Sequence, residues 1–397
     1  MSRCSRCFAR SRARSWTSPF GDGWGRALGS FPSRVKEADL VSETYVRPVK
    51  ARRDLGAIAS RIFGILLVLL VLSWLVVNFI KAPDDFGRVF LIGISQGALY
   101  ALVALGYTLV YGILELINFA HGDVFMIGGM ISATIALQGF GISAQESPAI
   151  GILIGAMLVS LVGAMIGCGL LNVVIERVAY KPLRGAPRLA PLITAIGMSF
   201  ILENVAIIWK GTRPVNLPSN EFSAGNGGQI FRIGHVVYTW DRLFVLLVTV
   251  PVLLGLIWLV QYTRQGKAMR ATAQDKDAAA MMGIDVDRTI SFTFLVAGAL
   301  AGAGGVIFAF YATTISFYTG FQLGLFAFTA AVLGGIGNLP GAVLGSVLIG
   351  LIQAFNEGLA WHSPGTKWTE SLVFAILITI LVFRPQGILG ERTPEGG

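Results

Sequence analysis

The sequence is dominated by ten long apolar runs that alternate with short polar segments. The runs lie at 62–80, 89–112, 124–137, 149–174, 190–209, 243–261, 290–311, 323–337, 342–355 and 371–383. A helix needs roughly 20 apolar residues to cross the hydrocarbon core of a membrane. Only 13% of the residues are charged, whereas soluble domains carry about 25%. The sequence therefore predicts an all-α, polytopic integral membrane protein with nine to ten transmembrane helices.

Two features of the runs bear on how these helices pack. Gly298, Gly302 and Gly305 lie along one broad face of their run, and helices in lipid associate through close backbone approach at small residues. Four runs are short enough to form tilted, broken or re-entrant segments, namely 124–137, 323–337, 342–355 and 371–383.

Positive charge gathers in three segments that fix the predicted topology. Residues 1–61 hold 13 Lys and Arg against 5 Asp and Glu, and basic segments remain in the cytoplasm. If all ten runs cross, the basic segments 177–188 and 264–288 fall on the same side as this tail. Both termini, including 390–397, are then cytoplasmic, and the loop 211–242 faces the other side.

The basic tail 1–61 is predicted to be disordered, because Ser, Gly and Arg dominate its first half. Cations beside a membrane helix attract anionic lipid headgroups, whereas a nucleic-acid site requires folded elements or interleaved aromatic residues. Membrane lipid is thus the predicted partner of the tail, and nucleic acid is not. Residues 62–89 are predicted to form an extra N-terminal hydrophobic helix and its linker.

The chain lacks the residues of a self-sufficient enzyme. The phosphate-binding pattern GxxxxGK[ST] is missing, since Gly266-Lys267 is followed by Ala268. Cys4 and Cys7 form at most half of a zinc site, which needs about four ligands. We therefore predict no catalytic residue, no metal and no cofactor in this chain.

A polar, Ala-rich stretch interrupts the apolar pattern between two of the runs. Within it, Asp277, Ala278, Ala279 and Gly283 follow the spacing D/E-A-A-x-x-x-G. This spacing is typical of membrane subunits that dock on a separate ATPase. The alternative interpretation is an amphipathic surface loop.

Polar and ionisable residues at membrane depth are costly and often functional. Six such residues are candidates for a translocation path or a helix break, namely Glu115, Asn118, His121, Asp123, Glu203 and Asn204. Gly122 is predicted to break the helix, with Asp123 capping the next one. The alternatives are a plain turn at the cytoplasmic interface for His121 to Asp123, and a hydrogen bond between helices for Glu203 and Asn204.

Several blocks, in order, resemble one family, the LivH-type permeases of branched-chain amino-acid ABC importers. The blocks are GISQGALYAL at 93–102, YTLVYG at 107–112, INFAHGD at 117–123, ERVAYKPLR at 176–184, AIGMSF at 195–200, RATAQD at 270–275, MGIDVDR at 282–288 and FTAAVLGGIG at 328–337. The likeness covers 90–389, which is therefore the expected permease domain, and the first 89 residues depart from the pattern.

The resemblance implies a multi-pass permease in a bacterial inner membrane, within an importer of several subunits. The implied partners are a second, LivM-like permease, two cytoplasmic ATP-binding subunits that bind the ATP, and a periplasmic substrate-binding protein. Asp277, Ala278, Ala279 and Gly283 take the position of the helix that couples to the ATPases, so the loop 263–289 is the expected coupling segment. The outer loop 211–242, with Arg213, Arg232 and Arg242, is a candidate dock for the binding protein or a plain connector.

The resemblance constrains the transported substrate less than the class of transporter, because related permeases move urea, short amides or other amino acids. Two other classes stay open on the residues alone. One is an ion-coupled secondary transporter, which would need acids paired within the bundle. The other is a channel or structural protein, which would not depend on a binding protein.

Overall fold

The computed structural model describes residues 69–142, 150–187, 189–217, 229–233, 236–359, 361, 363–384 and 386–390. The predicted tail 1–61, the first part of the extra segment (62–68) and the end of the chain (391–397) lie outside the described residues. Residues from Leu69 onward form a single compact unit, and the description below concerns that unit.

The described residues are mostly helical, which confirms the predicted all-α class. Eight helices are long and apolar enough to cross a membrane, and two shorter apolar helices accompany them. The long elements are α2 (Pro83–Leu114), α3 (Ala120–Thr134), α4 (Ile150–Ile175), α5 (Leu189–Lys210), α6 (Trp240–Tyr262), α9 (Val286–Ala312), α11 (Leu339–Gly358) and α12 (Thr369–Phe383). The shorter apolar helices are Leu69–Lys81 and α10 (Thr319–Gly334).

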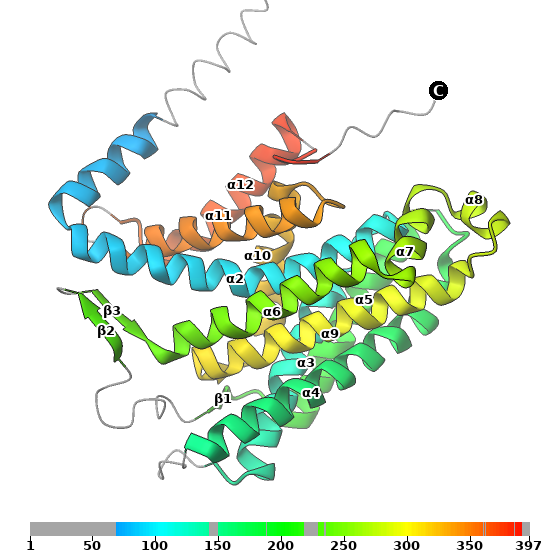
Figure 1. The fold of residues 1–397 in the computed structure, drawn as a ribbon, viewed down its shortest axis with the longest axis horizontal. Coiled ribbons are helices and arrows are strands. Elements are labelled where there is room, and N and C mark those ends of the chain that lie inside the picture. The colour runs from blue at the N-terminus through cyan, green and yellow to red at the C-terminus, as the bar shows by residue number, and fades with distance from the viewer. Residues whose placement is uncertain are drawn as a thin grey trace, which may run out of the picture. The chain divides into compact units, whose positions relative to one another are not determined.

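The remaining elements are short and lie at the ends of the long helices. The single-turn elements are η1 (Ile135–Gly139), η2 (Glu176–Tyr180), η3 (Lys181–Leu183) and η5 (Thr366–Trp368), and the short α-helices are α7 (Arg264–Gln274) and α8 (Lys276–Met281). The strands are β1 (Val215–Asn216), β2 (Gln229–Ile233), β3 (Val236–Thr239) and β4 (Thr314–Ile315). β1 pairs with β4 and β2 with β3, both antiparallel. In Figure 1, α7 and α8 lie at one end of the helices and the β2–β3 hairpin at the other; we call these the α8 end and the hairpin end.

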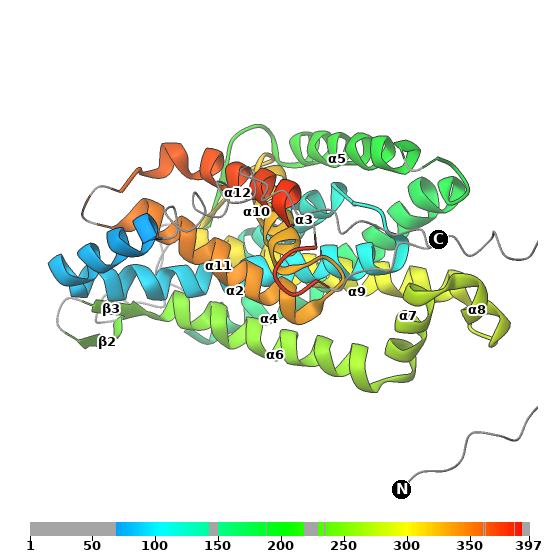
Figure 2. The ribbon, with the colours of Figure 1, turned by 90° about the horizontal axis from the view of Figure 1, so that it is seen from above.

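Helix α9 packs against α4, α3 and α2, and it lies among them in both views (Figures 1 and 2). A Cβ added at Gly298 would lie 2.6 Å from Asn172 Cβ, and one at Gly302 would lie 2.8 Å from the backbone carbon of Ala164. At Gly305 the nearest backbone belongs to α3. The predicted glycine face is therefore confirmed, because it lets α9 approach two helices at once.

The start of α2 shows how local chemistry sets an element boundary. The sequence pattern predicted a helix from residue 89, whereas α2 begins at Pro83. Proline fits the first position of a helix, where its missing N–H would have no helical partner. Asp84 and Asp85 occupy the first turn, where negative charge faces the positive end of the helix dipole.

The described part of the extra N-terminal segment docks on the core at the hairpin end. The side chain of Asn78 is buried, donates to the Trp361 carbonyl at 3.3 Å and accepts from the Trp361 N–H at 3.1 Å. Phe86 stacks on Phe355 of α11 and meets Phe79 edge-on. The helix Leu69–Lys81 is thus held by specific polar and aromatic contacts with the core.

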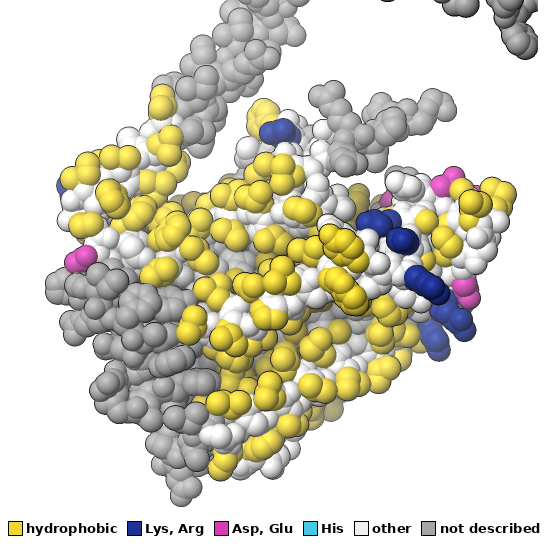
Figure 3. All heavy atoms as spheres, viewed as in Figure 1, with side chains coloured by type: hydrophobic (Ala, Val, Ile, Leu, Met, Phe, Trp, Pro, Cys, Tyr) yellow, Lys and Arg dark blue, Asp and Glu magenta, His cyan; other side chains and the backbone are white. Residues whose placement is uncertain are grey.

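The surface separates apolar from charged regions. Figure 3 shows hydrophobic side chains spread over the long helices, while Lys, Arg, Asp and Glu gather at the α8 end. Large apolar side chains lie exposed along several helices, among them Leu158 and Val162 of α4 and Leu247 and Leu254 of α6. An apolar belt with a charged end is the surface expected of a helical bundle embedded in lipid.

Close packing of α2 on α11 yields a stability prediction. A Cβ at Gly97 would lie 2.7 Å from Val347 Cα and 3.0 Å from the Ser346 carbonyl oxygen, so Gly97→Ala should lower the free energy of unfolding by about 1–3 kcal/mol. Gly255→Ala in α6 is the matched control, because nothing lies within 4 Å of its added Cβ. Thermal unfolding in detergent measures both; equal midpoints for the two variants would contradict the packing account.

Candidate coupling site and intramembrane polar residues

The segment between α6 and α9 contains two short helices, each with a defined start. Thr263 caps α7, its side-chain oxygen accepting from the Gly266 N–H at 3.0 Å. Asp275 caps α8, its Oδ1 accepting from the N–H groups of Asp277 and Ala278, both at 2.9 Å. Each cap satisfies N–H groups that have no partner inside the helix. The polar, Ala-rich stretch therefore forms an ordered helix–turn rather than an irregular loop.

The four residues of the predicted coupling motif occupy different environments. Asp277 and Gly283 are exposed, Ala278 is half-buried, and Ala279 is buried. Gly283 has a φ of 82°, and nothing lies within 4 Å of a Cβ built on it. The Ile284 N–H then donates to the Ala279 carbonyl at 3.1 Å. Ala279 thus packs inside the segment and its carbonyl accepts the closing hydrogen bond. Gly283 supplies the left-handed residue that ends the helix.

Two methionines at the end of α8 project from this segment and were not singled out in the sequence. Met281 is 82% exposed and Met282 is 85% exposed. Unbranched methionine side chains adapt to irregular apolar surfaces and are common at binding faces. The signal available in the sequence was the adjacent Met-Met pair within an otherwise polar segment.

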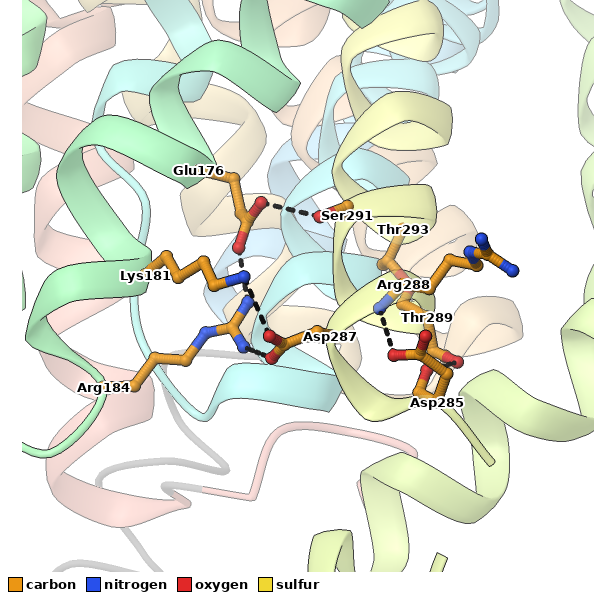
Figure 4. A network of polar contacts seen from close by, with 9 residues as sticks. All are labelled: Glu176, Lys181, Arg184, Asp285, Asp287, Arg288, Thr289, Ser291 and Thr293. Atoms are coloured by element: carbon orange, nitrogen blue, oxygen red, sulfur yellow. Dashed lines mark hydrogen bonds and ion pairs between the residues drawn. The ribbon is translucent and has the colours of Figure 1, made fainter. Parts of the chain in front are cut away.

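An ion-pair network lies beside the start of α9, at the α8 end (Figure 4). Arg184 contacts both Glu176 and Asp287, and Lys181 Nζ lies 2.8 Å from Asp287 Oδ2. The carboxylate of Glu176 is fully buried and also accepts from the Ser291 hydroxyl at 2.8 Å. The network therefore joins the end of α4 and the η3 turn to the first turns of α9.

The helix break lies three to seven residues before the predicted position, Gly122. α2 ends at Leu114, and Glu115 adopts a left-handed conformation with a φ of 58°. α3 begins at Ala120, so Gly122 lies inside a helix and Asp123 does not cap one. The prediction of a break at Gly122 was wrong. Gly122 instead lets α3 and α10 approach closely, because its added Cβ would lie 2.9 Å from Gly324 Cα.

Three of the predicted polar residues are buried within the helical bundle. Asn118 accepts from the Tyr180 hydroxyl at 2.8 Å, and Asp123 accepts from the Ser199 hydroxyl of α5. His121 is also buried and meets the ring of Tyr107 edge-on. The structure brings these side chains into contact with α2, α5 and η2, so each joins α3 or its preceding turn to a neighbouring element.

The other candidate residues are more accessible. Glu115 is exposed at the end of α2. Glu203 is half-buried on α5, and Asn204 is exposed. The amide of Asn204 donates to the Phe200 carbonyl within its own helix at 2.8 Å, rather than to another helix. Arg213 in the outer loop is exposed, while 218–228 lie outside the described residues.

Comparison with known proteins identifies the family. The profile described as "Branched-chain amino acid transport system / permease component" matches residues 89–382. The chain belongs to this family. It is a multi-pass membrane permease component of an ABC-type transport system, and a transport subunit rather than an enzyme.

Individual relatives match over most of their length. The chain is 40% identical to the high-affinity branched-chain amino acid transport permease LivH of Escherichia coli K12, over 76% of this chain and 95% of LivH. It is 39% identical to BraD of Pseudomonas aeruginosa, a permease of the same description, over 76% and 95%. The fructose import permease FrcC of Rhizobium meliloti is 25% identical, over 81% and 84%.

The buried Tyr180–Asn118 hydrogen bond provides a second stability prediction. Tyr180→Phe removes the donor and leaves a buried acceptor, so we expect the free energy of unfolding to fall by about 1 kcal/mol or more. Tyr318→Phe is the control, since Tyr318 is 48% exposed. Thermal unfolding midpoints measure the difference; a Tyr180→Phe midpoint equal to that of the control would show that the bond contributes nothing.

Proposed function

We propose that this chain is a permease subunit of an ATP-driven, binding-protein-dependent importer of branched-chain amino acids in a bacterial inner membrane. The observation that carries the proposal is α8, a capped and exposed helix with the predicted coupling spacing, at the charged end of an apolar bundle. Permease components named for branched-chain amino acids share 39–40% identity with the chain, which supports this cargo.

The proposed complex pairs the chain with a second, LivM-like permease, two ATP-binding subunits and a periplasmic substrate-binding protein. The α8 end carries the basic segments that favour the cytoplasmic side, so α8 would meet an ATP-binding subunit there. The hairpin end would then face the periplasm and the binding protein. Large apolar side chains exposed on α5 and α12 suit contact with lipid and with the second permease.

Coupling would occur through the tip of α8. Ala279 is buried against its own chain, whereas Asp277, Met281 and Met282 are among the exposed residues available to a partner. In our proposal the two methionines fill an apolar groove on the ATP-binding subunit. Asp285 caps α9 directly after this tip, its Oδ1 accepting from the Arg288 N–H at 3.0 Å. Closure of the ATPases would thereby move α9 and switch the cavity between the permeases from outward to inward facing.

Reconstitution tests the proposed function. The chain, its second permease and the ATP-binding subunits are placed in proteoliposomes, with loaded binding protein on the periplasmic face. Uptake of labelled leucine should require ATP and binding protein, and isoleucine or valine should compete while urea or acetamide should not. Uptake driven by an ion gradient without ATP-binding subunits would overturn the proposal. Competition by urea, with none by isoleucine or valine, would identify urea rather than a branched-chain amino acid as the substrate.

Gly283 should be essential for coupling because of its backbone conformation. Gly283→Val forces a β-branched residue into φ 82°, which strains the turn that ends α8. We expect normal expression but loss of substrate-stimulated ATP hydrolysis. Gly211→Val is the matched control, because Gly211 has φ 81° and open space at the opposite end. Unchanged stimulation in the Gly283 variant would remove this residue from the coupling account.

The exposed methionines should act as apolar anchors. Replacing both Met281 and Met282 with Ser should weaken association with the ATP-binding subunits by about a hundredfold or more, since each buried apolar side chain contributes about 1.5–3 kcal/mol. Replacing both with Leu keeps the apolar surface and should preserve binding. Co-purification in detergent over a series of ATP-binding subunit concentrations measures the affinity of each variant for that subunit. Equal affinities of the Ser and Leu variants would contradict the anchor role.

A further inference from the structure

We propose that four charged residues form a clamp that passes motion from the coupling segment to helix α5. The clamp consists of Glu176, Lys181, Arg184 and Asp287 (Figure 4). This inference rests on the proposed function, because it assigns these side chains a positioning role in energy coupling.

The clamp crosses between segments that are far apart in the sequence. Asp287 lies in the first turn of α9, four residues after Gly283. It contacts Lys181 of η3 and Arg184 directly after η3. Arg184 in turn contacts Glu176, the first residue of η2, which directly follows α4. A displacement of the α8–α9 junction is therefore transmitted to the connection between α4 and α5.

Burial sets the Glu176–Arg184 contact apart from ordinary surface ion pairs, which contribute little, whereas Lys181 and Asp287 are 50% and 55% exposed. Glu176 is 0% exposed and Arg184 is 23% exposed. A buried carboxylate requires a charged or hydrogen-bonding partner, and Glu176 has Arg184 and Ser291. Arg184 is thus fixed on one side by Glu176, so its second contact holds Asp287 in a defined place.

Helix α5 is the element that a displacement of the α8–α9 junction would move. In the described part of the chain, α5 packs mainly against α3 and η2, and Leu189, its first residue, follows Arg184 by five positions. α4 and α9 pack closely through Gly298 and Gly302, so they move together. Movement of this pair reaches α5 through the clamped turn, and α5 carries the half-buried Glu203 and the exposed Asn204.

The first test separates coupling from folding. Asp287→Asn removes the charge that Lys181 and Arg184 contact on α9, while the buried contacts of Glu176 with Arg184 and Ser291 remain. The reconstituted complex should keep its basal ATP hydrolysis, whereas leucine transported per ATP should fall about tenfold, within the range typical of allosteric coupling. Asp85→Asn is the matched control, because it breaks a comparably exposed ion pair with Arg88 at the hairpin end.

The second test restores the connection covalently. Lys181→Cys with Asp287→Cys is joined by a short bifunctional thiol reagent, in a chain whose Cys4 and Cys7 are replaced by Ser and whose third cysteine, Cys168, is buried. Transport per ATP should be low before joining and recover afterwards. Failure of the joined protein to recover would overturn the clamp, because the two segments would then have to separate during the cycle.

These experiments distinguish the clamp from the proposed function. If the unaltered complex shows no ATP-dependent leucine uptake, the proposed function fails. If it transports leucine and Asp287→Asn transports the same amount per ATP, the clamp alone fails. The variants could instead yield less assembled complex and less basal ATP hydrolysis, and joining the cysteines could fail to restore either. That result would assign the network a purely structural role and also overturn the proposal.

Discussion

Close backbone contact between α9 and its neighbours is the constraint on which the remaining structure depends. Gly298 and Gly302 bring α9 against α4, and Gly305 brings it against α3. In lipid, burial of apolar surface does not drive helices together, so close van der Waals packing must hold them. Side chains at these three positions would separate the helices. This packing fixes the position of α9 and therefore the positions of the segments that directly precede and follow it.

The α8 end is built directly on that packing. α8, the turn at Gly283 and the cap at Asp285 precede α9 without any intervening flexible segment. Asp287 then ties α9 to the turn before α5. In the proposed coupling, a force applied to α8 would act on the packed pair α4 and α9 and, through Asp287, on the turn before α5.

Much of this fold could be predicted because its signals are local or periodic. The apolar runs predicted the long helices, and the spacing of Gly298, Gly302 and Gly305 predicted the packing face of α9. The break at Glu115 could not be predicted, since a left-handed helix end normally uses Gly or Asn. The contacts of Glu176 with Ser291 and of Arg184 with Asp287 join residues more than 100 positions apart, and local sequence carries no record of such pairing.

The central claim is that α8 is the contact with the ATP-binding subunit. A photo-crosslinking amino acid at position 282 tests it in the assembled, ATP-hydrolysing complex, with the exposed position 318, between β4 and α10, as the comparison. The account predicts a crosslink to the ATP-binding subunit from position 282 and none from position 318. A complex that hydrolyses ATP and gives no such product from position 282, or gives it from position 318, would contradict the account.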